Sequence, residues 1–193
     1  TAYFLTAVSL FLLLFLFFTA HEAYYGAFYK AGRVAFSEKR YSSAISAYKK
    51  AEPLWLKRRL FYDESVAYFK RYTETLDSLL LEQGIQLLFQ ATHENPFDAF
   101  IMDAYAKTAY ENGKISATEA IVYYSEAISL DAKNNLAYYF HLLSAYVDEG
   151  DRKSFVAWEP HVLVLLERYS NQLRDNEHLT VLTDNPKYAF EIY

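Results

Sequence analysis

The sequence predicts an all-helical protein in which a membrane-spanning helix, residues 1–20, precedes about four stacked helix pairs in residues 21–175. Only five Gly and four Pro occur among 193 residues, which favours long helices over many short strands. Residues 1–20 carry no charge, whereas apolar and charged residues are interleaved along the rest of the chain. Helical segments with one common spacing of small and aromatic residues then recur. Residues 176–193 are predicted to form a C-terminal helix or the start of a further repeat.

The apolar segment from Thr1 to Ala20 predicts a transmembrane helix in contact with a lipid bilayer. Residues 10–18 are a continuous run of Leu and Phe, and about 20 helical residues cross roughly 30 Å of hydrocarbon. A signal peptide is the main alternative, although Phe18 is too large for the third position before a cut after Ala20. A buried helix of a soluble protein is another alternative, although such helices normally keep a polar stripe. His21 and Glu22 are expected to mark the exit to water.

A triplet of residues marks the second helix of each predicted pair. A small residue is followed four positions later by a large one, and three positions after that by Ala, so all three lie on one helix face. The small residues allow the paired helices to approach, and the large residue fills the gap beside them. The triplets are Ala44–Tyr48–Ala51, Gly84–Leu88–Ala91 and Ala120–Tyr124–Ala127.

Local signals indicate where several of these helices begin and end. Turns are predicted at residues 112–113 and 150–151, and the capping-box sequence from Ser116 to Glu119 predicts a helix start there. The first helix of the second pair is expected within residues 56–73, after about six extra residues around Trp55. In the fourth pair, Phe155 stands where Ala is expected. Pro160 should break or restart that helix, because it lacks a backbone N–H.

These patterns resemble the tetratricopeptide repeat, a helix–turn–helix unit of about 34 residues. Phe28, Gly32 and Tyr41 match the family pattern in the first repeat, and Pro96 stands at a closing position. The resemblance covers about residues 25–175 and implies a solenoid whose first helices line a concave binding surface. An irregular bundle of antiparallel helices is the alternative. The family pattern places seven partner-binding residues on this surface: Tyr29, Arg33, Asp103, Lys107, Tyr110, Phe140 and Ser144.

Composition argues against several other functions. The chain has no Cys, which excludes disulfides and thiolate chemistry, and its net charge of −5 without a basic stripe argues against nucleic-acid binding. Gly residues are isolated, so no phosphate-binding loop is predicted, and the carboxylates at 63–64 and 148–149 are expected to be solvated. We therefore expect no catalytic residue, no cofactor and no metal site in this segment. No two of the five histidines have the spacing of metal ligands on one helix: His21, His93, His141, His161 and His178.

The sequence thus predicts a membrane-anchored adaptor that binds a protein or peptide, with its repeats on the extracytoplasmic side. Stacking of uncapped repeats into a homo-oligomer is a further expectation. The arrangement also resembles the C-terminal region of O-antigen ligase and polymerase-like membrane proteins. That resemblance, which includes a span entering a repeat directly and the stretch of residues 91–99, implies an accessory domain of a glycan-transfer enzyme whose active site lies upstream. The missing initial Met and the ending at residues 187–193 predict that both ends are truncated.

Overall fold

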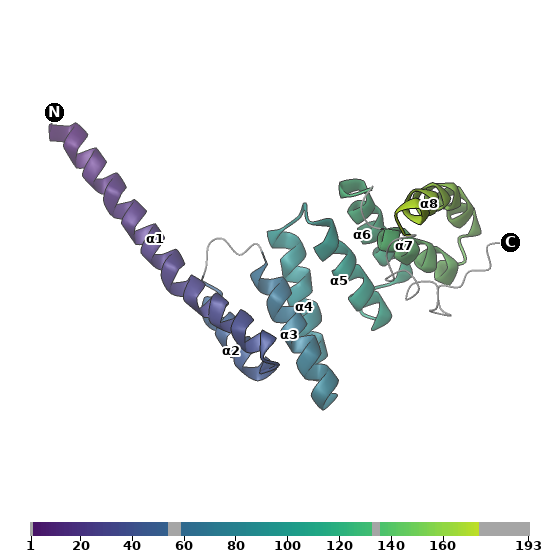
Figure 1. Ribbon diagram of the computed structural model, residues 1–193, viewed down its shortest axis with the longest axis horizontal. Coiled ribbons are helices and arrows are strands. Elements are labelled where there is room, and N and C mark those ends of the chain that lie inside the picture. Colours follow the sequence, from purple (N-terminus) through teal and green to yellow (C-terminus); the bar gives the residue numbers. More distant parts are fainter. Residues whose placement is uncertain (1, 54–58, 133–135, 174–193) are drawn as a thin grey trace. The chain divides into compact units, whose positions relative to one another are not determined.

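Helices account for nearly all of the chain that the computed structural model describes, which comprises residues 2–53, 59–132 and 136–173. These residues contain eight α-helices and no strand, which confirms the predicted all-helical fold (Figure 1). The segment around Trp55 and residues 176–193 lie outside the described residues. The helices are α1 (Ala2–Ser37), α2 (Tyr41–Ala51), α3 (Leu60–Thr75), α4 (Ser78–Glu94), α5 (Ala99–Glu111), α6 (Ala117–Leu130), α7 (Leu136–Glu149) and α8 (Arg152–Leu173).

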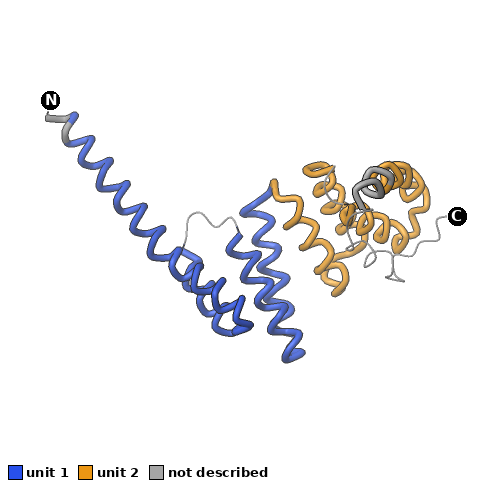
Figure 2. Tube along the Cα trace, viewed as in Figure 1, with its two compact units in different colours: residues 1–96 blue, residues 97–193 orange. Residues whose placement is uncertain are grey.

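The helices form two compact units. Unit 1 (Thr1–Pro96) holds α1 to α4, and unit 2 (Phe97–Tyr193) holds α5 to α8 (Figure 2). Within unit 1, α1 packs against α2 and α3 against α4. Within unit 2, α6 packs against both α5 and α7, and α8 packs against α7. The described part of the chain therefore contains the four predicted helix pairs.

Helix α1 joins the apolar segment to the first repeat without a break. It runs for 36 residues, and its last turns pack against α2. Side chains from Leu10 to Phe18 are between 49 and 68 % exposed, so this segment is not a buried core helix of the described chain. Among the described helices, α1 is the one long and apolar enough to cross a membrane, with a mean hydropathy of 1.7 in its candidate span.

The turns inside the four helix pairs repeat at a constant interval. Each contains one residue with positive φ, and these residues are Lys39, Leu76, Gly113 and Gly150, each 37 positions after the last. In the turns at 39, 113 and 150, this residue donates its N–H to the carbonyl three positions back. The next residue in each case donates to the carbonyl five positions back, as in a Schellman motif. The structural repeat is thus three residues longer than the family unit of about 34.

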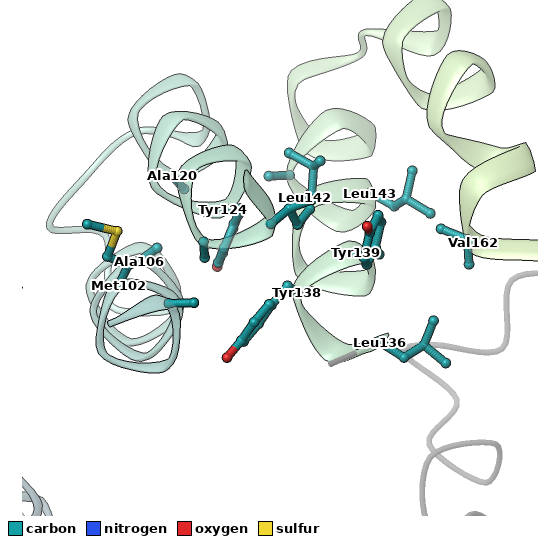
Figure 3. Close-up of a cluster of buried hydrophobic side chains, with 14 of the residues drawn as sticks. Met102, Ala106, Ala120, Tyr124, Leu136, Tyr138, Tyr139, Leu142, Leu143 and Val162 are labelled. Carbon is teal, nitrogen blue, oxygen red and sulfur yellow. The ribbon is translucent and has the colours of Figure 1, made fainter. Parts of the chain in front are cut away.

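The predicted triplets form the centre of each packed pair. Tyr48, Leu88 and Tyr124 are all at most 2 % exposed, and the Ala residues at the triplet positions are similarly buried. In unit 2, Tyr124 of α6 lies among Met102 and Ala106 of α5 and Leu142 of α7 (Figure 3). The pattern that predicted the repeats is therefore the pattern that forms their core.

The capping box at the start of α6 is confirmed. The Ser116 hydroxyl accepts a hydrogen bond from the Glu119 N–H at 3.2 Å, and the Glu119 carboxylate accepts one from the Ser116 N–H at 2.9 Å. The Ser116 N–H and the Ser116 hydroxyl both donate to the Glu119 carboxylate, and these two bonds lower the pKa of Glu119. Two backbone donors at the helix start are thereby satisfied.

Pro160 does not break its helix, contrary to the sequence prediction. Helix α8 continues through it from Arg152 to Leu173. Pro160 and Val156 both lie on the exposed side of α8, whereas Val162 is buried against the core. Water can therefore bind the carbonyl of Val156, which loses its helical partner at Pro160, and the buried face keeps the helix in place.

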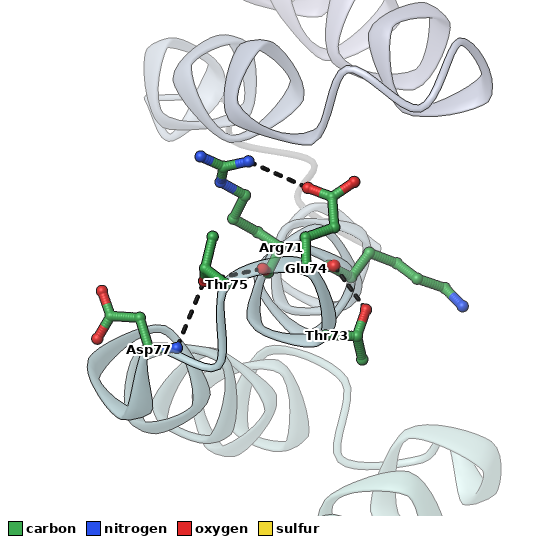
Figure 4. A network of polar contacts seen from close by, with 6 residues as sticks. Arg71, Thr73, Glu74, Thr75 and Asp77 are labelled. Carbon is green, nitrogen blue, oxygen red and sulfur yellow. Dashed lines mark hydrogen bonds and ion pairs between the residues drawn. The ribbon is translucent and has the colours of Figure 1, made fainter.

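Helix α3 ends in a network of local hydrogen bonds around the second positive-φ turn (Figure 4). The Arg71 guanidinium pairs with Glu74 at 3.0 Å, and the Thr75 hydroxyl donates to the carbonyl of Arg71 at 3.1 Å. Asp77 then caps α4 by accepting from the N–H of Leu79 at 3.0 Å. Leu76 between them is 76 % exposed, so its side chain contributes little packing to offset its left-handed backbone.

Replacing Leu76 with Gly should therefore stabilise the protein, by about 0.5–1 kcal/mol, because Gly adopts positive φ without a Cβ clash. Chemical denaturation followed by circular dichroism measures the change. Gly113→Ala at the equivalent turn is the control, because it places a Cβ on a residue with positive φ. It should destabilise the protein by about 1 kcal/mol. A loss of stability in Leu76→Gly would show that the turn does not carry the strain assigned to it.

Candidate partner-binding site

Unit 1 contains a groove on the side of α1 that faces α3. Its volume is about 340 Å³. Four of its lining residues come from the last three turns of α1, one comes from α2, and two come from the start of α3. The groove is lined by Tyr29, Arg33, Phe36, Ser37, Tyr48, Arg59 and Asp63. Two of the seven residues predicted to bind a partner, Tyr29 and Arg33, therefore lie in one groove.

A short hydrogen bond joins the two walls of this groove. The Tyr29 hydroxyl on α1 donates to Oδ2 of Asp63 on α3 at 2.5 Å. Burial, together with this bond and the Asp63 charge, raises the pKa of Tyr29 to about 12, so the phenol keeps its proton at neutral pH. The bond occupies a carboxylate oxygen that would otherwise face the groove.

The groove also presents two guanidinium groups. Arg33 and Arg59 are exposed, and within the described ranges neither has a carboxylate at ion-pair distance. Arg59 lies instead over the ring of Tyr62, 5.7 Å from its centroid. With Asp63 as the one acidic lining residue, the groove carries a formal charge of +1. This charge favours an anionic group of a ligand.

The floor of the groove depends on a close contact between α1 and α2. Tyr48 of α2 is 2 % exposed and its ring lies over Gly32 of α1, at a distance that leaves no room for a Cβ. The same ring lies 5.8 Å from that of Tyr29, centroid to centroid. Burial raises the pKa of the Tyr48 hydroxyl well above its ordinary value. A rigid apolar floor thus supports the polar groups above it.

In unit 2, two hydrogen bonds join the first helices of its pairs, α5 and α7. Oδ1 of Asp103 lies 2.7 Å from Nδ1 of His141, and both side chains are largely buried. The Tyr110 hydroxyl donates to Asp148 at 2.6 Å, which with burial raises the pKa of Tyr110 to about 12. In each pair the two residues are 38 positions apart, close to the repeat interval of 37. Tyr29 and Asp63 in unit 1 are 34 positions apart.

The other predicted residues of unit 2 occupy the same two helices. Lys107 pairs with Glu111 on α5 at 2.8 Å, and Phe140 and Ser144 are partly buried on successive turns of α7. Phe140 packs against the unit 2 core. Asp103 is also buried, at 7 % exposure, so it joins the helices rather than facing a ligand. No residue group with three or more potential metal ligands occurs in the described ranges.

Sequence reasoning missed several residues of these sites. Arg59 and Asp63 lie at the start of α3, beside a segment that matches the repeat pattern poorly, and His141 showed no motif. Glu64 was expected to be solvated, and this was wrong: it is 1 % exposed, and its Oε2 has no hydrogen-bond partner. Burial raises the pKa of Glu64 to about 7. Asp63 was also expected to be solvated, but its carboxylate accepts the Tyr29 hydroxyl in the groove. The one available signal was the family unit length of about 34 residues, which is the separation of Tyr29 and Asp63.

We expect Asp103→Ala to destabilise unit 2 by about 2–3 kcal/mol, because it leaves the buried His141 ring without its carboxylate. A double-mutant cycle with His141→Ala should give a coupling of about 1–2 kcal/mol, measured by denaturation of the purified full chain. Lys107→Ala on the same helix removes only an exposed ion pair and should change stability by less than about 0.5 kcal/mol. Additive effects of the two substitutions would contradict the assigned bond.

No protein-family model matches the sequence, and no curated protein matches it either. Solved structures do. A crystal structure of MamA is similar with a TM-score of 0.62 and 20 % identity, covering 76 % of this chain and 81 % of that one. YrrB, described as a TPR protein with an unusual peptide-binding site, has a TM-score of 0.55 and 17 % identity, covering 79 % and 70 %.

The fold is that of a tetratricopeptide-type helical repeat. At these identities, the likeness establishes the architecture and leaves function to the residues of this chain. The fold assigns α1, α3, α5 and α7 as the first helices of the repeats, which carry the groove of unit 1 and the joined polar pairs of unit 2.

Proposed function

We propose that this chain is a membrane-anchored repeat scaffold that binds a protein or peptide partner and does not itself catalyse a reaction. One observation carries the proposal: α1 is a single helix whose first half is exposed and apolar and whose last turns line the unit 1 groove. The first half suits a bilayer, and the groove suits an extended peptide. YrrB, with the same fold, is described as having a peptide-binding site, which supports this reading.

Within this proposal, Tyr29, Arg33 and Arg59 bind the partner in unit 1, and the exposed residues on the first helices of unit 2 form a separate contact surface of that unit. The polar rim supplies hydrogen bonds, and the partly exposed ring of Phe36 supplies apolar contact. Anchoring raises the local concentration of the groove at the membrane, so that a modest affinity suffices.

The proposal is tested by selecting binders from a random peptide library on the full chain in nanodiscs, then measuring affinity by fluorescence anisotropy. Arg33→Ala should weaken the selected peptides about 10- to 100-fold, which corresponds to one lost charge-assisted hydrogen bond. Lys30→Ala is the matched control, because Lys30 carries the same charge on α1, is exposed and does not line the groove. Equal losses in both variants would point to non-specific charge attraction and refute the assigned site.

A second candidate function is that of an accessory domain after the last span of an O-antigen ligase or polymerase-like enzyme. The uninterrupted passage of α1 from apolar segment to repeat supports it, because such a domain would be held rigidly against the membrane part. Reading the coding sequence before Thr1 is the test: several further spans support this candidate, and a start codon immediately before Thr1 excludes it.

We also propose that the repeats lie on the extracytoplasmic side. The chain has no Cys, so Ser42→Cys at an exposed site of α2 provides a single label position. In intact cells this variant should react with a membrane-impermeant maleimide. Protection until the cells are lysed would place the repeats on the other side.

Self-association is proposed through α8, whose outer face exposes Val156, Leu163 and Val164. A concentration-dependent mass in light scattering, abolished by Val164→Glu, is the expected result. A constant monomer mass would refute this proposal.

A further inference from the structure

The height of the unit 1 groove above the membrane limits what can enter it. Because α1 is one helix, each residue adds about 1.5 Å along its axis. The uncharged segment ends at Ala20, so Tyr29 lies about 14 Å and Arg33 about 20 Å beyond the hydrocarbon edge. A typical tilt of about 20° shortens these heights by only about a twentieth. The hydrogen bond from Tyr29 to Asp63 holds α3, and with it Arg59, at the level of Tyr29.

Phospholipid headgroups do not reach this groove. They extend only about 5–8 Å beyond the hydrocarbon on each side, which leaves the Arg33 guanidinium well above them. A peptide that leaves the same bilayer reaches it easily. An extended chain advances about 3.3–3.6 Å per residue, so about six residues cover the distance to Arg33.

The charges of the groove define the chemistry of that peptide. Arg33 and Arg59 present two guanidinium groups, whereas the carboxylate of Asp63 already accepts the Tyr29 hydroxyl. A carboxylate side chain placed between the two arginines would gain charge-assisted hydrogen bonds from both. Phe36 beside them would cover the apolar neighbours of that carboxylate in the peptide.

From this geometry we infer that the unit 1 groove binds the acidic juxtamembrane segment of a partner anchored in the same membrane, at a carboxylate about six or more residues from that partner's membrane edge. The inference rests on the proposed function, in that α1 spans the bilayer and the groove binds a peptide. It adds the partner's location, its charge and the length of its connecting segment. Helix α1 acts as the spacer that sets this length.

The experiment places the full chain in neutral phosphatidylcholine vesicles, together with dipalmitoylated peptides that carry a Gly/Ser linker and, directly after it, a single glutamate at an amidated C-terminus, so that the linker length sets how far the carboxylate reaches. Linkers of 2, 6 and 12 residues are compared with the same peptide without lipid. We expect the 6- and 12-residue linkers to bind at least about tenfold more tightly than the 2-residue linker, because only they reach the groove. Arg33→Ala should weaken these complexes about tenfold, and Lys30→Ala should not.

A spacer variant distinguishes height from simple membrane tethering. Inserting seven helix-forming residues between Glu22 and Ala23 adds about two turns, which raises the groove by about 10 Å and rotates it by only about 20°. The 6-residue linker should then lose its advantage, and the 12-residue linker should keep it. Equal binding of all linkers, or an unchanged length dependence after the insertion, would overturn the inference.

Failure of the proposed function gives a different result. If neither the free nor any tethered peptide distinguishes the wild-type chain from Arg33→Ala, the groove does not bind acidic peptide, and both the site and the inference are refuted. If phosphatidylglycerol added to the vesicles displaces the bound peptide, the arginines bind lipid instead, which also overturns the inference.

Discussion

Replacing Gly32 with Ala should destabilise unit 1 by about 2 kcal/mol and weaken peptide binding to its groove. A Cβ at this position would lie 2.5 Å from a ring carbon of Tyr48, which is far inside van der Waals contact. Tyr48 is 2 % exposed and packed on all sides, so its ring can move aside only if α2 moves away from α1. Overpacking of this kind typically costs about 1–3 kcal/mol, which exceeds the gain in helix propensity from Gly to Ala.

Gly26 provides the matched control on the same helix. A Cβ there meets nothing within 4 Å, so Gly26→Ala should stabilise α1 by about 0.5–1 kcal/mol. Hydrogen exchange of the full chain in nanodiscs, read by mass spectrometry, measures both variants and uses peptides of unit 2 as an internal reference. Stabilisation by both substitutions would show that α1 and α2 are not in the close contact described.

The stability of unit 1 should fall as the pH rises through about 7, because of Glu64. Burial is the main cause that raises the pKa of this carboxyl from 4.5 to about 7. The charge of Glu52, the residue directly after α2, raises it further, and Lys49 acts in the opposite direction. The folded state therefore keeps the Glu64 proton in a range where the unfolded chain has released it. The contribution of the protonated Glu64 to the stability of unit 1 is fully present below about pH 4.5 and is lost as the pH rises through 7.

The shift from 4.5 to about 7 corresponds to about 3 kcal/mol between the two ends of this range. Glu64→Gln should remove most of that dependence, since the amide does not titrate. Local opening free energies for α2 and α3 at pH 5 and pH 8, from hydrogen exchange, measure it. Glu52→Gln should lower the pKa of Glu64. Unit 1 should then lose less stability between pH 5 and pH 7. A pH dependence that is the same in the wild type and Glu64→Gln would exclude Glu64 as its source.

The repeats could be predicted from the sequence because their signals are local. Triplets such as Ala44–Tyr48–Ala51 depend on spacings of four and three along one helix, and the capping box at Ser116 lies within four residues. The two Gly turns were visible for the same reason. Lys39 and Leu76 hold equivalent backbone positions, but their side chains give no sign of positive φ, so the 37-residue interval was not apparent.

The site was only partly predictable because it depends on contacts between helices. Tyr29 and Arg33 followed from the repeat pattern of α1, whereas Arg59 and Asp63 enter the groove through the packing of α1 against α3. The same kind of packing buries Glu64, which on α3 alone resembles a solvated residue. Pro160 shows the converse: the rule for an isolated helix was overridden by burial of the opposite face of α8.

The central claim, that the groove on α1 is the partner-binding surface, is tested most directly by photo-crosslinking in native membranes. A photoreactive phenylalanine analogue replaces Phe36, which lines the groove, and in a second variant Val122, which is 60 % exposed on α6. We expect one dominant crosslinked product from position 36, lost when Arg33 is also replaced by Ala, and none from position 122. Products of equal yield from both positions, or a product at 36 that is unaffected by Arg33→Ala, would contradict the claim.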